Sequence, residues 1–477
     1  MKYDIIIIGA GLGGLTAGAK LSKSGRKVLL IEQHDRPGGC ATTFERKDFT
    51  MEVGLHEMDG LHAKDMKTKI FRDLGVFDEV EFLKVPEFYR FINSNYDFVM
   101  PHNPDKATKK LIEIFPNEAA GINAYFDRIL NANLKNKEEE IEKNLGEFLD
   151  SIIKDENLKL ILLGNLGYFH DNPYTLSLSY YSVAQGSYFA GGGNFIKGGS
   201  QKLSNYLSEF IKINGGEVLL KNTVSKIITK ENKAVGVVYH KTNNETETKN
   251  AFSDEIIANA AIPNIAKYML PKEFGKNLQN EIAKRKPGAS LLTIYFGFNT
   301  PLKNIGSKYY STFIYDDSVK SQADILKNNQ SDFDKRSFTF VDYSQIDSAL
   351  APKGKSTGAV CCIDYTFDWD NLDKKKYKAK KEKVARIFIE RLEKLIPGFK
   401  NAIEYYEVGT SKTVERYTLN PQGAVYGFAQ TPENVILKKI KSIENLHFAS
   451  AWTKTGGGFS GAIFSGYLCA FDILRKR

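Results

Sequence analysis

A glycine-rich turn near the amino terminus has the residue spacing that binds a dinucleotide. It follows the apolar run Ile5–Ile8 and consists of Gly9, Ala10, Gly11, Leu12, Gly13 and Gly14. In such a turn the first glycine permits the tight bend, the second lets the backbone approach a pyrophosphate, and the third lets the helix pack on the strand. A second apolar run, Lys27–Ile31, ends at Glu32, whose carboxylate can accept both ribose hydroxyls. We therefore expect this turn, with Glu32 and Gln33, to bind an adenine dinucleotide whose pyrophosphate lies at the helix N-terminus.

NAD and FAD both satisfy that pattern, and the next segment distinguishes between them. A glycine pair follows the second strand and continues into a short polar segment: Gly38, Gly39, Cys40, Ala41, Thr42 and Thr43. The glycines allow a second close approach of the backbone, and threonine hydroxyls can donate to a phosphate or to the edge of a flavin. A nicotinamide dehydrogenase has no need of such a segment here. The expected cofactor is FAD.

A second glycine cluster lies close to the carboxyl terminus. After Trp452, the residues Gly456, Gly458 and Gly461 match the dinucleotide spacing, but only sixteen residues follow, too few for another strand with its acid. We expect instead the start of a helix, with Gly461, Ala462 and Ile463, whose dipole stabilises negative charge on a reduced flavin. These residues and Trp452 are expected to contact the cofactor, as are Cys40 and Ala41 beside the glycine pair. Residues 456–461 contain no Cys, His or Tyr, so the FAD is expected to be non-covalent.

One dinucleotide motif leaves no dedicated NAD(P)H site visible in the sequence. Electrons are therefore expected to come from, or to leave to, another carrier such as a quinone or oxygen. The four cysteines, Cys40, Cys361, Cys362 and Cys469, show no metal-ligand spacing and no C-x-x-C pair. They are expected to be reduced thiols, and no metal site is predicted.

These segments together resemble the phytoene desaturase, carotenoid isomerase and retinol saturase family of FAD-dependent oxidoreductases. The resemblance runs through most of the chain and adds further matching segments: Val53–His56, Asn194–Gln201, Gly215–Val218 with Val224, Asn259–Pro263, Glu415–Tyr417 with Gly423–Gly427, and Trp452–Gly466. It implies that Val224 follows the strand bordering the adenosine and that Ala260 lies in the next crossover. Both are therefore expected to contact the cofactor.

The resemblance implies a two-domain flavoprotein that acts on the double bonds of a long apolar molecule. Such enzymes transfer a hydride at flavin N5, as desaturases, saturases or isomerases, and their substrates are carotenoids, retinoids and related lipids. Two positions depart from the desaturase pattern: Cys40 stands where arginine is usual, and Lys197 replaces a usual proline. Cys40, with His56 in the following segment, is more similar to the saturase and isomerase branches.

His56 and Glu57 are the candidates for the proton that accompanies the hydride. The resemblance places this segment near the flavin ring, and an unperturbed histidine has a pKa near 6.5 that suits proton transfer at neutral pH. A histidine here can also serve only to pack or to hydrogen-bond the backbone. Two rival classes share the fold: a flavin amine oxidase, and a flavin-free lipid-binding escort or GDP-dissociation inhibitor. The escort class loses the phosphate-cradling glycines, which are intact in this chain.

The elements expected around these motifs give an α/β fold. We expect a discontinuous Rossmann-type FAD domain, of the glutathione-reductase and amine-oxidase kind, over residues 1–63, 195–265 and 405–477. An inserted substrate domain of mixed helix and sheet would cover 64–194 and 266–404, with 64–165 mostly helical. Expected strands are Ile5–Ile8, Lys27–Ile31, Glu217–Leu220, Val224–Thr229, Ala234–His240, Leu291–Phe298, Ser337–Val341 and Leu446–Ala451, and expected helices are Leu15–Lys23, 202–213 and Ala462–Leu474.

Composition and charge constrain where the chain acts. The 477 residues have 42% hydrophobic and 26% charged content, as in globular proteins, and the first strand begins almost at Met1, which predicts a cytoplasmic protein without a leader. The net charge is +9, and a lysine-rich amphipathic helix is predicted over 374–395. That helix is read as a solvated face or as a peripheral contact with anionic lipid. Nucleic acid is not expected as a partner, because no reading module accompanies the charge. The oligomeric state stays open.

Overall fold

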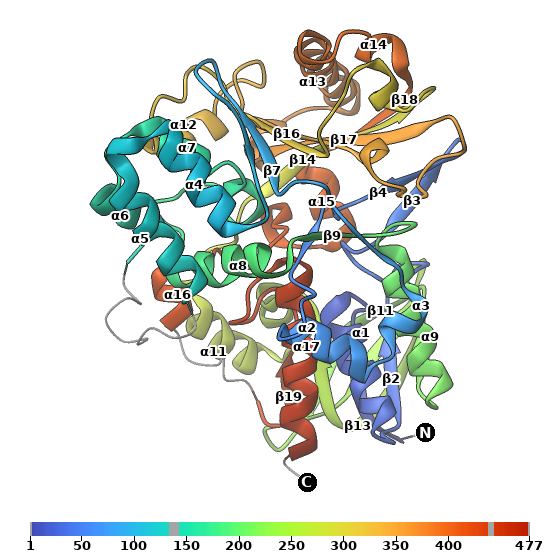
Figure 1. The fold of residues 1–477 in the computed structure, drawn as a ribbon. Helices are drawn as coiled ribbons and strands as arrows, with labels where there is room; N and C mark the ends of the chain where they lie inside the picture. The colour runs from blue at the N-terminus through green and yellow to red at the C-terminus, as the bar shows by residue number, and fades with distance from the viewer. Residues whose placement is uncertain (1, 133–142, 437–442, 476–477) are drawn as a thin grey trace.

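Two sheets of seven strands each organise the chain, and a layer of helices flanks the second (Figure 1). The computed structural model describes residues 2–132, 143–436 and 443–475. Among these residues, no helix is both long enough and apolar enough to cross a bilayer. The charged part of the region predicted to be mostly helical, residues 133–142, lies outside the described residues.

The first sheet is built on the two apolar runs near the amino terminus. β1 (Lys2–Ile8) pairs in parallel with β2 (Val28–Ile31) on one side and with β13 (Asn244–Ala258) on the other. The strand order is β10-β2-β1-β13-β12-β11, with β19 also paired to β13. The other strands are β10 (Glu217–Leu219), β11 (Asn222–Lys230), β12 (Lys233–Lys241) and β19 (Leu446–Phe448). The central strands are buried because helices cover both faces of the sheet.

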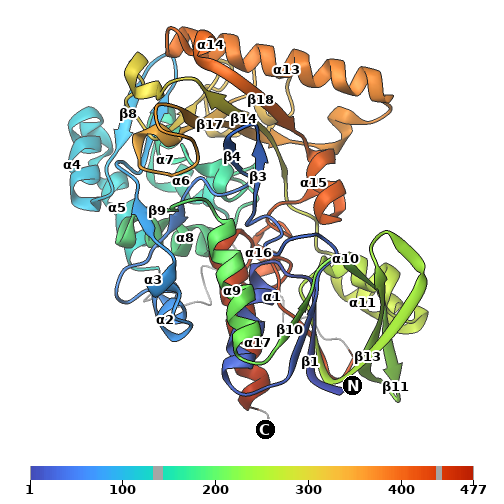
Figure 2. The ribbon, with the colours of Figure 1, turned by 90° about the vertical axis from the view of Figure 1, so that its right-hand side faces the viewer.

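The alternation of isoleucines in β1 divides the first sheet's packing into two cores. Ile5 and Ile7 pack against α1 (Leu12–Lys23), α9 (Gln201–Ile213) and α17 (Gly458–Arg475), which lie side by side in Figure 2. Ile6 and Ile8 face the opposite core, which includes residues of α10 (Ile262–Asn264) and α11 (Lys272–Ile282). The period of two in a strand produces this division.

The second sheet is mostly antiparallel, with the order β18-β14-β17-β16-β15-β7-β8. Its strands are β7 (Tyr89–Ile92), β8 (Asp97–Met100), β14 (Ser290–Phe298), β15 (Ser311–Ile314), β16 (Phe338–Asp342), β17 (Ser356–Asp364) and β18 (Ile403–Gly409). The long helix α13 (Lys374–Leu395) covers the outer face of this sheet (Figure 2), because Val384, Phe388 and Leu392 pack into the core beneath it. The first turns of α13, which hold most of its lysines, stay exposed.

The remaining elements connect and flank the two sheets. The helical layer contains α4 (Pro104–Ile114), α5 (Ala119–Leu130), α6 (Leu145–Ile152), α7 (Glu156–Leu162), α8 (Leu178–Gly191) and α12 (Ile325–Asn329). Between the sheets lie the hairpin β3 (Thr43–Arg46) and β4 (Phe49–Glu52) and the small sheet of β5 (Met58–Asp59), β9 (Gly193–Ile196) and β6 (Phe82–Lys84). Shorter helices are α2 (Met66–Asp73), α3 (Val76–Glu79), α14 (Phe399–Ala402), α15 (Ser411–Thr418) and α16 (Pro432–Ile436).

The expected class of fold is confirmed, and several element boundaries are corrected. α1 begins at Leu12 and α17 at Gly458, so each helix contains glycines that the sequence analysis assigned to the preceding turn. β19 ends at Phe448 rather than Ala451. The region predicted as mostly helical also contains strands β6, β7 and β8. Elements that were not predicted include β13, whose polar first half is exposed in a hairpin with β12, and α8, whose glycines and aromatic residues obscure its helical character.

The division of the chain into domains stays a prediction. The first sheet draws its strands from the start, the middle and the end of the chain, with bounds 2–31, 217–258 and 446–448. Residue 405, the predicted start of the last segment of the FAD domain, falls within β18 of the second sheet.

Close packing between α1 and α17 joins the two ends of the chain. A Cβ added at Gly466 of α17 would lie 2.1 Å from the carbonyl oxygen of Gly13 in α1, and one added at Gly13 would lie 2.5 Å from the carbonyl oxygen of Ala449. The opposing groups are backbone atoms, so they cannot move aside as a flexible side chain would. Glycine at position 466 therefore lets the last helix touch the first, and glycine at position 13 lets the first helix approach the segment after β19.

We expect Gly466→Val to force α17 away from α1. Because overpacking a close helix contact costs about 1–3 kcal/mol, the free energy of unfolding and the Tm should both fall in chemical and thermal denaturation. The control is Leu468→Ala, an exposed position of the same helix, which should change stability by no more than about 0.5 kcal/mol. Equal stability of Gly466→Val and the unchanged protein would contradict this packing.

Candidate active site

The amino-terminal glycine turn is shaped by one side chain from a distant strand. Asn259, which follows β13, donates from Nδ2 to the carbonyl oxygen of Gly9 at 3.1 Å. A Cβ added at Gly9 would lie 2.5 Å from the Asn259 carbonyl oxygen, and one at Gly11 would lie 2.9 Å from its Nδ2. Gly9 also has φ +93°, a conformation that favours glycine. Asn259 was noticed only within a matching segment, because nothing local to the turn signals that it packs there.

The glycine pair predicted to approach the cofactor lies directly against the first turn. The N–H of Gly38 donates to the carbonyl oxygen of Ala10 at 2.7 Å, and Gly11 and Gly38 form an isolated parallel bridge. A Cβ added at Gly39 would lie 3.3 Å from the Cα of Gly11. Gly38 and Gly39 both have positive φ, +131° and +62°. The structure therefore brings the two amino-terminal glycine segments together.

Glu32 closes the other side of the turn. Its side chain is buried, and its two carboxylate oxygens accept from the N–H of Ala10 at 2.7 Å and from that of His34 at 2.9 Å. The carbonyl oxygen of Glu32 accepts from the N–H of Asn222, which opens β11, the strand that also contains the buried Val224. Gln33 is half-buried beside it. Ala260 follows Asn259 and is also half-buried.

The residues after the glycine pair differ from one another in burial and in hydrogen bonding. Cys40 is half-buried, and burial raises the pKa of its thiol to about 11, so it is protonated at neutral pH. The carbonyl oxygen of Ala41 accepts from the Ser204 hydroxyl at 2.7 Å. The Thr42 hydroxyl contacts the side-chain amide of Gln201, whereas Thr43 is buried in β3.

The carboxyl-terminal residues predicted to contact the cofactor fall into two groups. Gly457 to Gly461, at the start of α17, line the cavity described in the next paragraph, and Ala462 follows in the same turn. Trp452 and Ile463 instead have their side chains in the protein core. The Trp452 indole N–H donates to the Asn420 side chain at 3.2 Å. The side chains of Trp452 and Ile463 are therefore occupied by packing inside the protein.

A cavity of about 810 Å³ opens in front of the N-terminal end of α17. Its lining comes from both sheets and from the helical layer, and includes His56, Glu57, Tyr168, Tyr188, Thr293, Cys361 and Tyr426. The two residues predicted to handle a proton therefore lie on the same cavity as the carboxyl-terminal glycines. Aromatic and aliphatic side chains make up much of its wall, so a large apolar ligand fits its chemistry.

Glu57 is a buried carboxyl without a hydrogen-bond partner among the described residues. Its exposed fraction is 8%, and both oxygens lack partners. Burial raises the pKa of Glu57 well above its ordinary value, and the nearby Glu87 and Asp59 carboxyls raise it further. Because a charged carboxylate in such surroundings is strongly disfavoured, Glu57 is a neutral acid with a proton to donate.

His56 is uncharged beside it. Burial lowers the pKa of the His56 imidazole to about 4, so the ring is neutral at physiological pH. The ring lies 5.7 Å from that of Tyr168, and the His56 carbonyl oxygen accepts from the Tyr310 hydroxyl. The pair therefore offers a neutral acid and a neutral imidazole on one wall.

Glu52, which the sequence analysis did not select, holds the segment that carries this pair. Its carboxylate accepts from the N–H groups of Gly54 and Leu55 at 3.1 and 3.0 Å. It also accepts from the N–H and the hydroxyl of Ser200, both at 2.7 Å. Glu52 therefore clamps the loop before His56 to the segment that opens α9. In the sequence Glu52 is only the last residue of a short strand, and nothing near it indicates these contacts.

The residues present fit an FAD molecule. The glycine turn leaves backbone, with no Cβ, at the N-terminus of α1, where a pyrophosphate binds. The second glycine segment lies against that turn, and the cavity before α17 provides room for a ring system. Among the described residues, no group of three His, Cys, Asp or Glu side chains could hold a metal ion.

Comparison with known proteins agrees with this geometry. The family model for flavin containing amine oxidoreductases matches residues 12–474. The chain belongs to this family. It is therefore a flavin-dependent oxidoreductase, and its cofactor is FAD.

Two curated relatives of this flavoprotein are named for different substrates. One is the all-trans-retinol 13,14-reductase of Danio rerio, 24% identical over 99% of this chain and 86% of the relative. Another is the chloroplastic prolycopene isomerase of Daucus carota, 28% identical over 99% of this chain and 80% of the relative. A solved oxidoreductase from Methanosarcina mazei covers all of both chains with a TM-score of 0.67 at 17% identity, which shows the shared fold.

We expect Gly38→Ala to yield a flavoprotein depleted of its cofactor. A Cβ at this position would lie 2.2 Å from the Ala41 carbonyl oxygen, so the segment must shift away from the first turn. The measurement is the flavin absorbance per polypeptide after purification, which should fall severalfold. Gly25→Ala is the control, because Gly25 also has positive φ but nothing within 4 Å of an added Cβ. Full flavin content in Gly38→Ala would contradict the role of this segment.

Proposed function

We propose that this flavoprotein transfers hydride to or from the carbon–carbon double bonds of a long apolar molecule. One observation carries the proposal. A large, mostly apolar cavity begins at the N-terminal end of α17, and it is lined by Glu57, a neutral carboxylic acid without a hydrogen-bond partner among the described residues. The names of the two curated relatives, a retinol reductase and a prolycopene isomerase, support a polyene substrate such as a carotenoid, a retinoid or a related lipid. FAD, when bound, supplies the hydride acceptor or donor.

We infer that the cofactor is held by residues from the two ends of the chain, together with Val224 and Ala260 from its middle. These are Gly9, Ala10, Gly11, Leu12, Gly13, Gly14, Glu32, Gln33, Gly38, Gly39, Cys40, Ala41, Thr42, Thr43, Val224, Ala260, Trp452, Gly461, Ala462 and Ile463. Support for the first group is the contact between the two glycine segments. Support for the last group is the N-terminal end of α17 at the cavity, where free N–H groups stabilise negative charge.

Glu57 is proposed to manage the proton. A neutral carboxylic acid at the cavity can protonate a substrate carbon when the double bond is reduced, and the same group, once ionised, can take a proton in the opposite direction. His56 is proposed to orient the substrate or to exchange the proton, because its neutral ring lies on the same wall. Exclusion of water by the surrounding tyrosines keeps the acid protonated.

An amine oxidase is the alternative within the family. Flavin amine oxidation needs no proton donor beside an alkene, so the buried neutral acid favours the polyene reaction. The test has two arms. In the first, anaerobically reduced holoprotein is given polyenes and retinoids, and the products are analysed for saturation or isomerisation. In the second, oxidised holoprotein in air is given the same polyenes, with analysis for desaturation, and primary amines and polyamines, with detection of hydrogen peroxide. New saturated, desaturated or isomerised polyene would support the proposal, and peroxide formed only with amines would overturn it.

We expect Glu57→Gln to lower kcat for double-bond reduction by about 100-fold or more, because general acid catalysis contributes about 10²–10⁴. KM should change little. In the unchanged protein the raised pKa of Glu57 leaves the acid protonated at neutral pH, so activity should be full below that pKa and fall as pH rises through it. Glu57→Gln should lose this alkaline limb.

The matched control is Glu87→Gln. Glu87 is a neighbouring carboxyl whose pKa burial also raises, but it is not among the residues that line the cavity. Its substitution should leave kcat within about threefold of the unchanged protein. An unaltered kcat and pH profile in Glu57→Gln would remove Glu57 from the reaction, whatever the substrate.

Peripheral membrane contact through α13 is also proposed. Lys374, Lys375, Lys376, Lys378 and Lys383 are exposed along the first half of the helix, while its apolar side is used in the core beneath. Attraction to anionic lipid would then be electrostatic, about 1 kcal/mol for each basic residue near the surface. We expect sedimentation with vesicles rich in phosphatidylserine to weaken as salt rises, and to be lost when these lysines become glutamine. Equal sedimentation of both proteins would contradict the contact.

A further inference from the structure

His170 is a buried histidine on the cavity wall that the proposed mechanism does not use. Its exposed fraction is 9%, and it lines the cavity beside Phe169, Ile325 and Asn329. The ring nitrogen Nε2 has no hydrogen-bond partner among the described residues. A buried polar group that stays unpaired is unfavourable, so its partner is expected from outside the chain.

The other edge of the ring determines which nitrogen carries a hydrogen. The backbone N–H groups of Asp171 and Asn172 both point at Nδ1, at 2.9 and 3.1 Å. When Nδ1 accepts from these groups, or when the ring is charged, Nε2 carries a hydrogen and donates. When Nδ1–H instead donates to the Asp171 carboxylate, Nε2 carries no hydrogen and accepts.

A carboxylate and a tyrosine lie behind the ring. Asp171 Oδ1 is 2.8 Å from Nδ1, and Oδ2 accepts from the Tyr365 hydroxyl at 2.7 Å. Burial raises the pKa of Asp171, but its contacts with His170 and Tyr365 outweigh burial and leave that pKa below its ordinary value. The ionised Asp171 balances any positive charge on the ring. The His170 ring and Asp171 together therefore carry no net positive charge.

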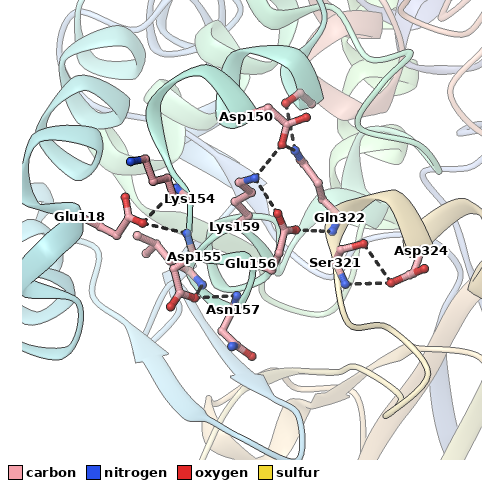
Figure 3. A network of polar contacts seen from close by, with 12 residues as sticks. Glu118, Asp150, Lys154, Asp155, Glu156, Asn157, Lys159, Ser321, Gln322 and Asp324 are labelled. Atoms are coloured by element: carbon pink, nitrogen blue, oxygen red, sulfur yellow. Dashed lines mark hydrogen bonds and ion pairs between the residues drawn. The ribbon is translucent and has the colours of Figure 1, made fainter.

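Helix α12, which also lines this part of the cavity, is fixed by hydrogen bonds at both ends. Asn329, at the end of α12, donates to the carbonyl oxygen of Asp171 at 2.9 Å. The segment before α12 is bound by the polar network of Figure 3, in which the buried Lys159 contacts Asp150 at 2.6 Å and Glu156 at 2.7 Å. Gln322 joins it by donating to the same two carboxylates.

His170 and α17 mark different parts of the cavity. The residues around His170 come from α12 and from strands β16 and β17, whereas Ser460, Gly461 and Phe464 of α17 line another part. In Figure 1, α12 lies high on the left, well apart from the N-terminal end of α17 near the centre. A long ligand with its reacting carbons near α17 can therefore extend to His170.

We propose that His170 Nε2 binds a hydroxyl group at one end of the apolar substrate. This proposal rests on the proposed function and narrows its substrate class to hydroxyl-bearing chains over plain hydrocarbons. A hydroxyl can both donate and accept, so it supplies the hydrogen-bond partner that Nε2 lacks among the described residues, whichever ring nitrogen holds the hydrogen. A carboxylate is disfavoured, because the anionic Asp171 lies directly behind the ring.

The experiment compares three ligands that share one C20 polyene chain: the terminal alcohol, the hydrocarbon without oxygen, and the carboxylic acid. Binding to the FAD-loaded full-length protein is followed by the change in flavin absorbance, without turnover. We expect the alcohol to bind about tenfold more tightly than the hydrocarbon, as expected when a ligand satisfies one buried polar group. The acid should bind more weakly than the alcohol.

Three variants locate that difference. His170→Phe removes the hydrogen-bonding nitrogen and should abolish the preference for the alcohol while leaving hydrocarbon binding within about threefold. His170→Gln restores a side chain that can donate and accept, and should recover part of the preference. His102→Phe is the matched control, because His102 is also largely buried with an unpartnered Nδ1 but is not among the cavity-lining residues. Its preference should equal that of the unchanged protein.

The outcomes separate this proposal from the proposed function. Binding of the hydrocarbon with no preference for the alcohol, or a preference that persists in His170→Phe, would overturn the oxygen subsite and leave the polyene reaction intact. Failure of all three ligands to perturb the flavin would overturn the apolar substrate class itself, and the subsite with it. A preference that disappears only in His170→Phe supports the subsite.

Discussion

Close contact between backbone segments, possible only where side chains are absent, is the constraint on which the rest of this structure depends. Gly466 lets the last helix touch the first at Gly13, and Gly38 lies against the turn at Ala10. The first of these contacts joins residues separated by more than four hundred positions in the chain. A bulkier side chain at any of them would push apart the walls between which an extended dinucleotide must lie.

A second theme is how the cavity handles buried charge. Asp59 and Lys67 form a buried ion pair at 2.9 Å beside the end of α17, and the Ser460 hydroxyl donates to Asp59. Burial raises the pKa of Asp59, but its contacts with Lys67 outweigh burial, so that group stays ionised. Glu57 has no such partner in the part of the chain that the structure describes, and it is neutral. The two neighbouring acids therefore differ in protonation because, among the described residues, Asp59 has a cation within reach and Glu57 has none.

The strand and helix around the first glycine turn could be predicted from the sequence, whereas the cavity could not. The turn at Gly9, the acid Glu32 and the pair at Gly38 are recognisable because each lies within a few residues of the strand or helix that positions it. His56 and Glu57 came from resemblance to a family, and the chain alone does not reveal that one is a neutral acid. Asn259 and Glu52 contribute contacts from distant segments, which local spacing does not show.

By itself, the sequence determined the class of fold, the dinucleotide and the expectation of a flavin, because strand periodicity and glycine spacing act over a single supersecondary unit. Only the tertiary structure decided which polar groups are buried with partners and which are buried without them. Glu57 and His170 each have a buried polar atom without a partner among the described residues, whereas Glu52 and Lys159 are buried with partners. Desolvation and long-range pairing depend on what surrounds a side chain in space, and residues far apart in the chain supply those surroundings.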